Sequence, residues 1–159
     1  MNDLQKYFVM AGDVAKNAEC NRAKCGSIIV KDGNIIGTGF NGPAQYGNNS
    51  KFCELQLDYL KKPKYDKTCC VHAEWRAIVD ACKSNPDKIV GSTLYFMRID
   101  TVGNFTDAGE PFCTVCSRLS LEAGIKYFVL WNNGSAVIYD ANDYNKITYD
   151  YFINTNNAD

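Results

Sequence analysis

The sequence contains a single histidine, His72. Any metal site or acid–base chemistry that uses an imidazole must therefore be built around that one position. No segment approaches the ~18 consecutive apolar residues of a membrane-spanning helix, so we expect no membrane association. The first residues also lack the basic and apolar regions of a secretion signal, which predicts a cytoplasmic protein.

The sequence also has little net charge. The formal charge is −1, the isoelectric point is about 5.8, and lysines and arginines are scattered in short groups. Proteins that bind polynucleotides usually gather basic residues into one patch. The charge distribution therefore weighs against a nucleic-acid partner and favours a small-molecule substrate.

The length of 159 residues fits one domain with its own hydrophobic core. We expect this domain to span residues 1–153, followed by a disordered, Asn-rich tail at residues 154–159. Eight cysteines in a chain without a secretion signal indicate free thiols and metal ligands more than a disulfide framework.

The hydrophobic pattern predicts alternating helices and strands. Periodic apolar residues predict an amphipathic helix over about residues 3–18. Two β-rich runs separated by Asp32 and Gly33 predict a hairpin. Strands are also expected at 93–97, 126–131 and, at an edge, 136–139; helices are expected from His72 to Asn85 and from Cys113 to Ala123.

Two segments lack a regular pattern. The sequence from Gly37 to about residue 70 is rich in glycine and polar residues, so we expect a long connection there with a short helix near residues 53–62. Residues 100–110 form a second polar loop. Long connections in compact domains are often functional.

Two motifs carry chemistry, and each opens a predicted helix. Cys113 and Cys116 are three residues apart, so their thiolates point to one side of the helix start and gain from its dipole. Addition of His72 gives three ligands and leaves the fourth tetrahedral position open to water, as in catalytic zinc sites. Zinc in such a site lowers the pKa of a bound water to about 7.

Glu74 follows His72 by two residues. An ideal helix would rotate it about 200° away from His72, so it is poorly placed as a ligand unless the first turn is frayed. A carboxylate beside the metal is better suited to carry protons between water, a ring nitrogen and a leaving amine. A redox cysteine pair, two buried cysteines, or a structural zinc completed by Cys69 or Cys70 are the alternatives.

With these motifs the sequence resembles the cytidine and deoxycytidylate deaminase superfamily, whose signature is His-x-Glu followed by Pro-Cys-x-x-Cys. Residues 22–33 and 36–42, which include Gly39-Phe40-Asn41-Gly42, are similar to the hairpin and turn of deoxycytidylate deaminases. The resemblance spans most of the chain. It implies an α/β protein with a three-layer α/β/α fold, a five-stranded mixed sheet, and the two metal-bearing helices side by side.

The resemblance also implies an activity and a site. The activity is zinc-dependent deamination of a cytosine nucleotide, dCMP to dUMP being the best guess, with Zn²⁺ on His72, Cys113 and Cys116 and with Glu74 as proton carrier. Asn41 is expected to bind the sugar or phosphate, the backbone amide of Ala73 to meet the pyrimidine carbonyl, and the protein to form a homo-oligomer with composite active sites. Asn41 could instead be a turn residue that tolerates a left-handed φ.

Three departures from the family pattern bear on the substrate. Phe112 separates the proline from the first cysteine, Trp75 and Arg76 replace a polar pair, and the 98–110 loop is long. Arg76 could meet a phosphate, although a surface ion pair is the more ordinary role, and Trp75 is expected in the core. Cytidine, guanine or a modified nucleotide are therefore alternative substrates, and a nucleic-acid deaminase or a non-catalytic zinc module are the remaining alternatives.

The other cysteines leave one more question open. Some deoxycytidylate deaminases carry a second, structural zinc near the hairpin, and five cysteines here lie in that region: Cys20, Cys25, Cys53, Cys69 and Cys70. An all-cysteine site is one interpretation, and ordinary buried or free thiols are the other.

Overall fold

The computed structural model describes residues 3–20, 23–46 and 70–156. The elements follow in the order α1 (Asp3–Ala15), β1 (Lys24–Lys31), β2 (Asn34–Phe40), α2 (Ala73–Ser84), β3 (Thr93–Ile99), β4 (Phe105–Thr106), α3 (Thr114–Glu122), β5 (Tyr127–Asn132), β6 (Ser135–Asp140) and α4 (Ala141–Asn156), with a short 3₁₀ helix at Pro86–Lys88. The expected helix near residues 53–62 lies outside the described residues.

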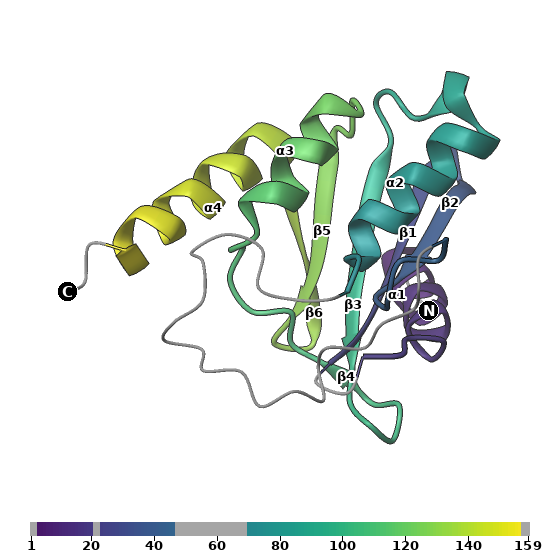
Figure 1. Cartoon of the computed structure of the whole chain (residues 1–159), viewed down its shortest axis with the longest axis horizontal. Helices are drawn as coiled ribbons and strands as arrows, with labels where there is room; N and C mark the ends of the chain where they lie inside the picture. The colour runs from purple at the N-terminus through teal and green to yellow at the C-terminus, as the bar shows by residue number, and fades with distance from the viewer. Residues whose placement is uncertain (1–2, 21–22, 47–69, 157–159) are drawn as a thin grey trace.

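One mixed sheet forms the middle layer of the molecule (Figure 1). Its order is β2-β1-β3-β5-β6, with β3 and β5 parallel and the other neighbours antiparallel. These five strands confirm the predicted sheet. The short β4 is an addition that the sequence pattern did not predict: it lies in the expected polar loop and pairs with the end of β3.

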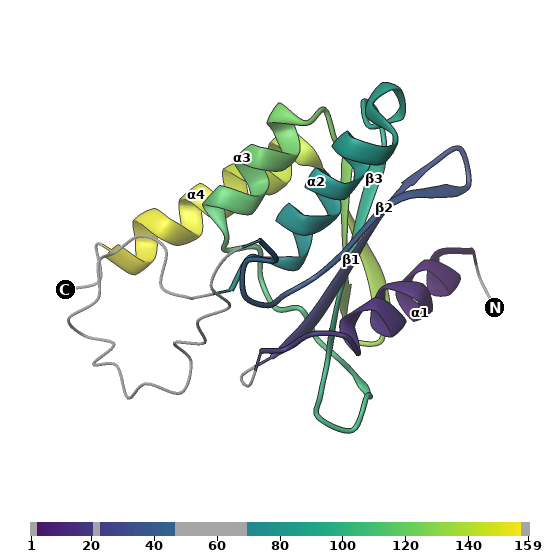
Figure 2. The ribbon, with the colours of Figure 1, turned by 45° about the vertical axis from the view of Figure 1, so that its right-hand side comes forward.

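Helices cover both faces of the sheet (Figure 2). The amphipathic α1 packs on one face, where Phe8, Ala11 and Ala15 join a buried cluster with alternate residues of β1 and β3. The other face carries α2, α3 and α4. The two faces are buried by alternate side chains of the same strands, which explains why β3 reads as an unbroken apolar run.

β1 and β2 form the predicted hairpin, with Asp32 and Gly33 at its turn. Asp32 and Gly33 both have positive φ, at 49° and 77°, as a two-residue hairpin turn of this hand requires. The expected break in regular structure at Gly37 is wrong, because β2 continues to Phe40. A Cβ on Gly39 would lie 2.3 Å from the carbonyl oxygen of Ala73, so glycine is needed there for the close approach of α2.

The last helix was not predicted from the sequence. α4 continues to Asn156, so helical structure reaches into the segment expected to be a tail, and residues 157–159 lie outside the description. Its Tyr144 stacks on Phe128 of β5 with ring centroids 3.9 Å apart. Its Thr148 is fully buried and hydrogen-bonds with Ser117 of α3, which ties α4 to the helix that follows Cys113.

Over the described residues, no helix is both long and apolar enough to cross a membrane.

Candidate active site

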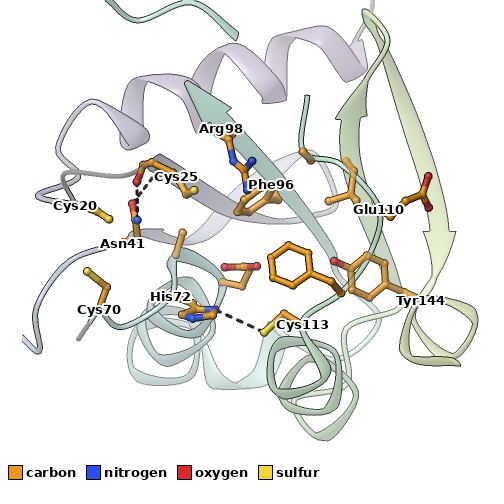
Figure 3. Close-up of a pocket in the computed structure, with 16 residues that line it drawn as sticks. Cys20, Cys25, Asn41, Cys70, His72, Phe96, Arg98, Glu110, Cys113 and Tyr144 are labelled. Carbon is orange, nitrogen blue, oxygen red and sulfur yellow. Dashed lines mark hydrogen bonds between the residues drawn. The ribbon is translucent and has the colours of Figure 1, made fainter. Parts of the chain in front are cut away.

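Three predicted ligands meet where α2 and α3 begin. His72 precedes the first residue of α2, and Cys113 precedes the first residue of α3. The imidazole Nδ1 of His72 lies 3.1 Å from the sulfur of Cys116. It lies 3.6 Å from the sulfur of Cys113 (Figure 3). All three donor atoms lie within 4.8 Å of one another.

This donor set fits a zinc ion. Bond lengths of about 2.0–2.1 Å to nitrogen and 2.3 Å to sulfur in a tetrahedral site place the ligand atoms about 3.5–3.8 Å apart, close to the spacing found. Among the described residues, no fourth His, Cys, Asp or Glu joins the cluster. Cys70 is described but is not part of it, whereas Cys69 lies outside the description. Within the described residues, the three side chains leave the fourth tetrahedral position open, as in catalytic zinc sites.

The local structure prepares one sulfur as a thiolate. The backbone N–H of Cys116 donates to the Cys113 sulfur at 3.3 Å. The hydrogen bond with the Cys116 thiol has the largest effect on the pKa of Cys113; together with His72 it outweighs the opposing effect of burial and lowers that pKa to about 5. Burial raises the pKa of Cys116. A divalent cation that binds the pair would deprotonate both sulfurs.

Glu74 faces the same cavity as the ligands, contrary to what ideal helix geometry suggests. His72 has extended backbone dihedrals, φ −68° and ψ 152°, so the helical rotation begins only after it. His72 and Glu74 therefore both line a cavity of about 240 Å³. Glu74 is only 8% exposed, and burial raises its pKa above the ordinary value. A carboxylate whose pKa is raised holds a proton more readily than an ordinary carboxylate, which suits it to accept a proton and pass it on.

Asn41 is held by the protein itself. Its Oδ1 accepts from the Cys25 backbone N–H at 2.8 Å, and its Nδ2 donates to the carbonyl oxygen of Ala23 at 2.8 Å. It lines the cavity next to the start of β1 (Figure 3). An amide nitrogen carries two hydrogens, so one N–H of Asn41 remains for a ligand. Ala73 also lines the cavity, and its backbone N–H belongs to the first helical turn, where amides have no intrahelical acceptor.

Two neighbours of Glu74 have roles that the sequence analysis did not predict. Trp75 is half-buried and stacks on the His72 imidazole, with centroids 4.7 Å apart and planes 14° apart, so it orients a ligand ring. Arg76 donates to the Pro43 carbonyl oxygen at 2.7 Å and lies over the Phe40 ring. These contacts fix the loop after β2.

The cavity has further walls that sequence motifs missed. Phe96 and Arg98 of β3, Leu130 of β5 and Tyr144 of α4 line it together with Phe112, which is 51% exposed. The sequence could have pointed to Arg98 as a site residue, because a cation is unusual in a strand buried on both faces. It could not have pointed to Tyr144, because the helix that holds this residue was not predicted.

Comparisons with known proteins agree with this geometry. A family model described as the cytidine and deoxycytidylate deaminase zinc-binding region matches residues 1–132. The chain is 29% identical over 134 residues to a deoxycytidylate deaminase of Mycobacterium phage D29. The matched region covers 80% of this chain and 93% of that protein.

Solved structures are also similar. A dCMP deaminase from cyanophage S-TIM5, solved in complex with dCMP and dUMP, has a TM-score of 0.58 and 27% identity, covering 80% of each chain. A cytidine deaminase from Burkholderia pseudomallei has a TM-score of 0.57 and 19% identity, covering 88% of this chain and 94% of the other, and shows the shared fold. The chain therefore belongs to the family of zinc-dependent cytidine and deoxycytidylate deaminases.

Proposed function

We propose that the protein hydrolyses dCMP to dUMP with release of ammonia. The observation that carries the proposal is the His72, Cys113 and Cys116 cluster with the Glu74 carboxyl facing the same cavity. Similarity to two phage enzymes named as deoxycytidylate deaminases supports the choice of nucleotide. A zinc ion held by the three ligands would supply Lewis-acid activation of the attacking water.

Glu74 carries the protons of the reaction. Net hydrolysis adds the water oxygen to the ring carbon that bears the amine and releases ammonia, so both protons of the water must leave that oxygen, one to N3 and one to the departing amine. Because burial raises its pKa, the Glu74 carboxylate can take the first proton and deliver it in turn. Apolar walls at Phe96 and Leu130 exclude bulk water from the base during these transfers.

Asn41 and Ala73 position the substrate in this proposal. The remaining N–H of Asn41 donates to the sugar or phosphate, and the backbone N–H of Ala73 donates to the pyrimidine carbonyl. Both groups are rigid, because Asn41 is fixed by two hydrogen bonds and Ala73 is buried at the start of α2. Rigid donors orient the ring without a large entropic cost on binding.

The test is ammonia release by zinc-loaded protein from dCMP, dCTP, CMP, deoxycytidine, cytosine, guanine and adenosine. We expect dCMP to have the highest kcat/KM. Glu74→Gln should lower turnover by at least about 10²-fold while zinc content stays at one ion per chain. Glu122→Gln, an exposed residue of α3, is the matched control and should leave turnover unchanged.

The other outcomes lead elsewhere. Turnover of another member of the panel but not of dCMP would keep the mechanism and replace the substrate. Silence across the panel with zinc fully bound would favour a non-catalytic zinc module.

We also infer, from the family resemblance, that the protein forms a homo-oligomer; the phage and bacterial origin of its relatives fits a cytoplasmic location. Light scattering coupled to size exclusion would report the mass, and a monomer of 17.8 kDa would contradict this inference.

A further inference from the structure

One arginine reaches the cavity from the sheet itself. Arg98 lies near the end of β3, on the same face as Leu94 and Phe96 because alternate residues of a strand share a face. Figure 3 shows its side chain directed toward the cavity beside Phe96 and Cys25. Of the described residues that line the cavity, it is the only one with a permanent positive charge.

The guanidinium is not fully satisfied by the protein. Its Nε is buried without a hydrogen-bond partner, and no carboxylate in the described ranges forms an ion pair with it. Thr106 pairs with Arg98 across β3 and β4, and its buried hydroxyl also lacks a partner. Buried polar atoms are nearly always hydrogen-bonded, so two orphaned groups at one paired position of the sheet indicate a missing ligand.

The neighbouring Cys25 thiol does not neutralise the positive charge of Arg98. Cys25 pairs with Arg98 across β1 and β3, and its sulfur lies close to the guanidinium. Burial raises the pKa of Cys25 to about 12, so its thiol is neutral at physiological pH. The acidic side chains that line the cavity, Glu74 and Glu110, would repel an anion when ionised. Arg98 is therefore the group that can make the cavity accept one.

We infer that Arg98 binds the phosphate of the substrate and makes the cavity prefer a nucleoside monophosphate to the matching nucleoside. The inference rests on the proposed function, since it assigns the recognition of one part of dCMP. A planar guanidinium binds two phosphate oxygens at once, and such charge-assisted hydrogen bonds are strong in a desolvated site.

Kinetics of the zinc-loaded enzyme test the assignment. Arg98→Met keeps much of the apolar stem and removes the charge. We expect its kcat/KM for dCMP to fall about 100-fold, with little change for deoxycytidine, because only dCMP loses a charged hydrogen-bonded partner. Arg118→Met, on the exposed face of α3, is the matched control and should change neither value. Equal losses for dCMP and deoxycytidine would overturn the inference and leave the proposed function standing.

Binding of product gives a readout that does not depend on turnover. Calorimetry with dUMP and deoxyuridine should show tighter binding of dUMP by the wild type, and Arg98→Met should remove most of that difference. Equal affinity of the wild type for the two ligands would overturn the inference, whether or not the enzyme turns over dCMP. If Arg98→Met does not fold, Arg98→Lys takes its place: it keeps the charge without the planar fork and should lose about 10-fold for dCMP relative to deoxycytidine. No relative loss in that variant would also overturn the inference.

Discussion

At the scale of single residues, two cysteines of the same cavity have opposite chemistry. The hydrogen bond with Cys116 lowers the pKa of Cys113 to about 5, whereas burial raises that of Cys25 to about 12. In the metal-free protein at pH 7, Cys113 is therefore a thiolate and Cys25 a neutral thiol. Only the thiolate is nucleophilic.

We predict that iodoacetamide alkylates Cys113 of the metal-free protein much faster than Cys25 at pH 7, as measured by peptide mass spectrometry. Lowering the pH through about 5 should slow the reaction of Cys113, because the thiolate is then protonated. Zinc should protect Cys113 and leave Cys25 unchanged. Protection of Cys25 by zinc would contradict the ligand set.

Motif spacing identified the ligands and the proton carrier but not the residue that orients the His72 ring. His72, Cys113, Cys116 and Glu74 could be chosen from spacing, because residue types and helix starts are visible in a sequence. The stacking of Trp75 on His72 could not, since an aromatic residue in an amphipathic helix reads as core. Its ring orientation depends on the extended backbone of the residue before the helix.

At the scale of elements, the contact between β2 and α2 positions the site. Gly37 and Gly39 of β2 lie against the backbone of α2, and a Cβ at Gly39 would meet both Ala73 and Ala77 at 2.3 Å. Any side chain there must push α2 away from the sheet. α2 begins directly after His72 and carries Glu74 in its first turn, so the displacement would move one metal ligand and the proton carrier.

We predict that Gly39→Ala lowers the free energy of unfolding by about 3 kcal/mol and weakens zinc binding. Urea denaturation and a competitive zinc indicator measure the two effects. Gly42→Ala is the matched control, because its Cβ would meet nothing closer than 3.7 Å and its φ is not in the left-handed region. Similar losses in both variants would mean that the glycine–helix contact is not the cause.

The sequence predicted most elements and misjudged those that depend on partners. Turn residues and periodicity correctly placed the hairpin, α2, α3 and the buried strands. β4 is only two residues long and exists because β3 offers an edge, and α4 has a weak amphipathic pattern with polar contacts to Ser117. Such elements are stabilised by tertiary contacts, which a local pattern does not record.

At the scale of the whole molecule, the stability of the fold should depend on zinc binding. Its ligands lie at the starts of two helices, α2 and α3, whose first residues, Ala73 and Thr114, are 41 residues apart in the sequence. An ion that binds only the folded state raises the free energy of unfolding, and the increase grows with the ratio of the free ion concentration to the dissociation constant. It reaches about 4 kcal/mol when the concentration is a thousand times the dissociation constant.

We predict that removal of zinc by a chelator lowers Tm by about 10 °C, as measured by differential scanning calorimetry. Glu74→Gln should show the same shift, because the variant keeps all three ligands. Cys116→Ser should start near the Tm of the metal-free protein and respond little to the chelator. A chelator-independent Tm in the wild type would contradict zinc binding at this cluster.

By itself the sequence determined the chemistry that the chain can offer: one imidazole, a Cys-x-x-Cys pair at a helix start, a carboxylate two residues from the histidine, and the strands and turns around them. These are local properties, fixed by residue type and by neighbours within a few positions. The tertiary structure decided what meets what. Only in the folded chain do Glu74 and Arg98 face the same cavity and does α2 pack directly against Gly39. Burial and proximity of this kind depend on packing between segments that are far apart in the sequence.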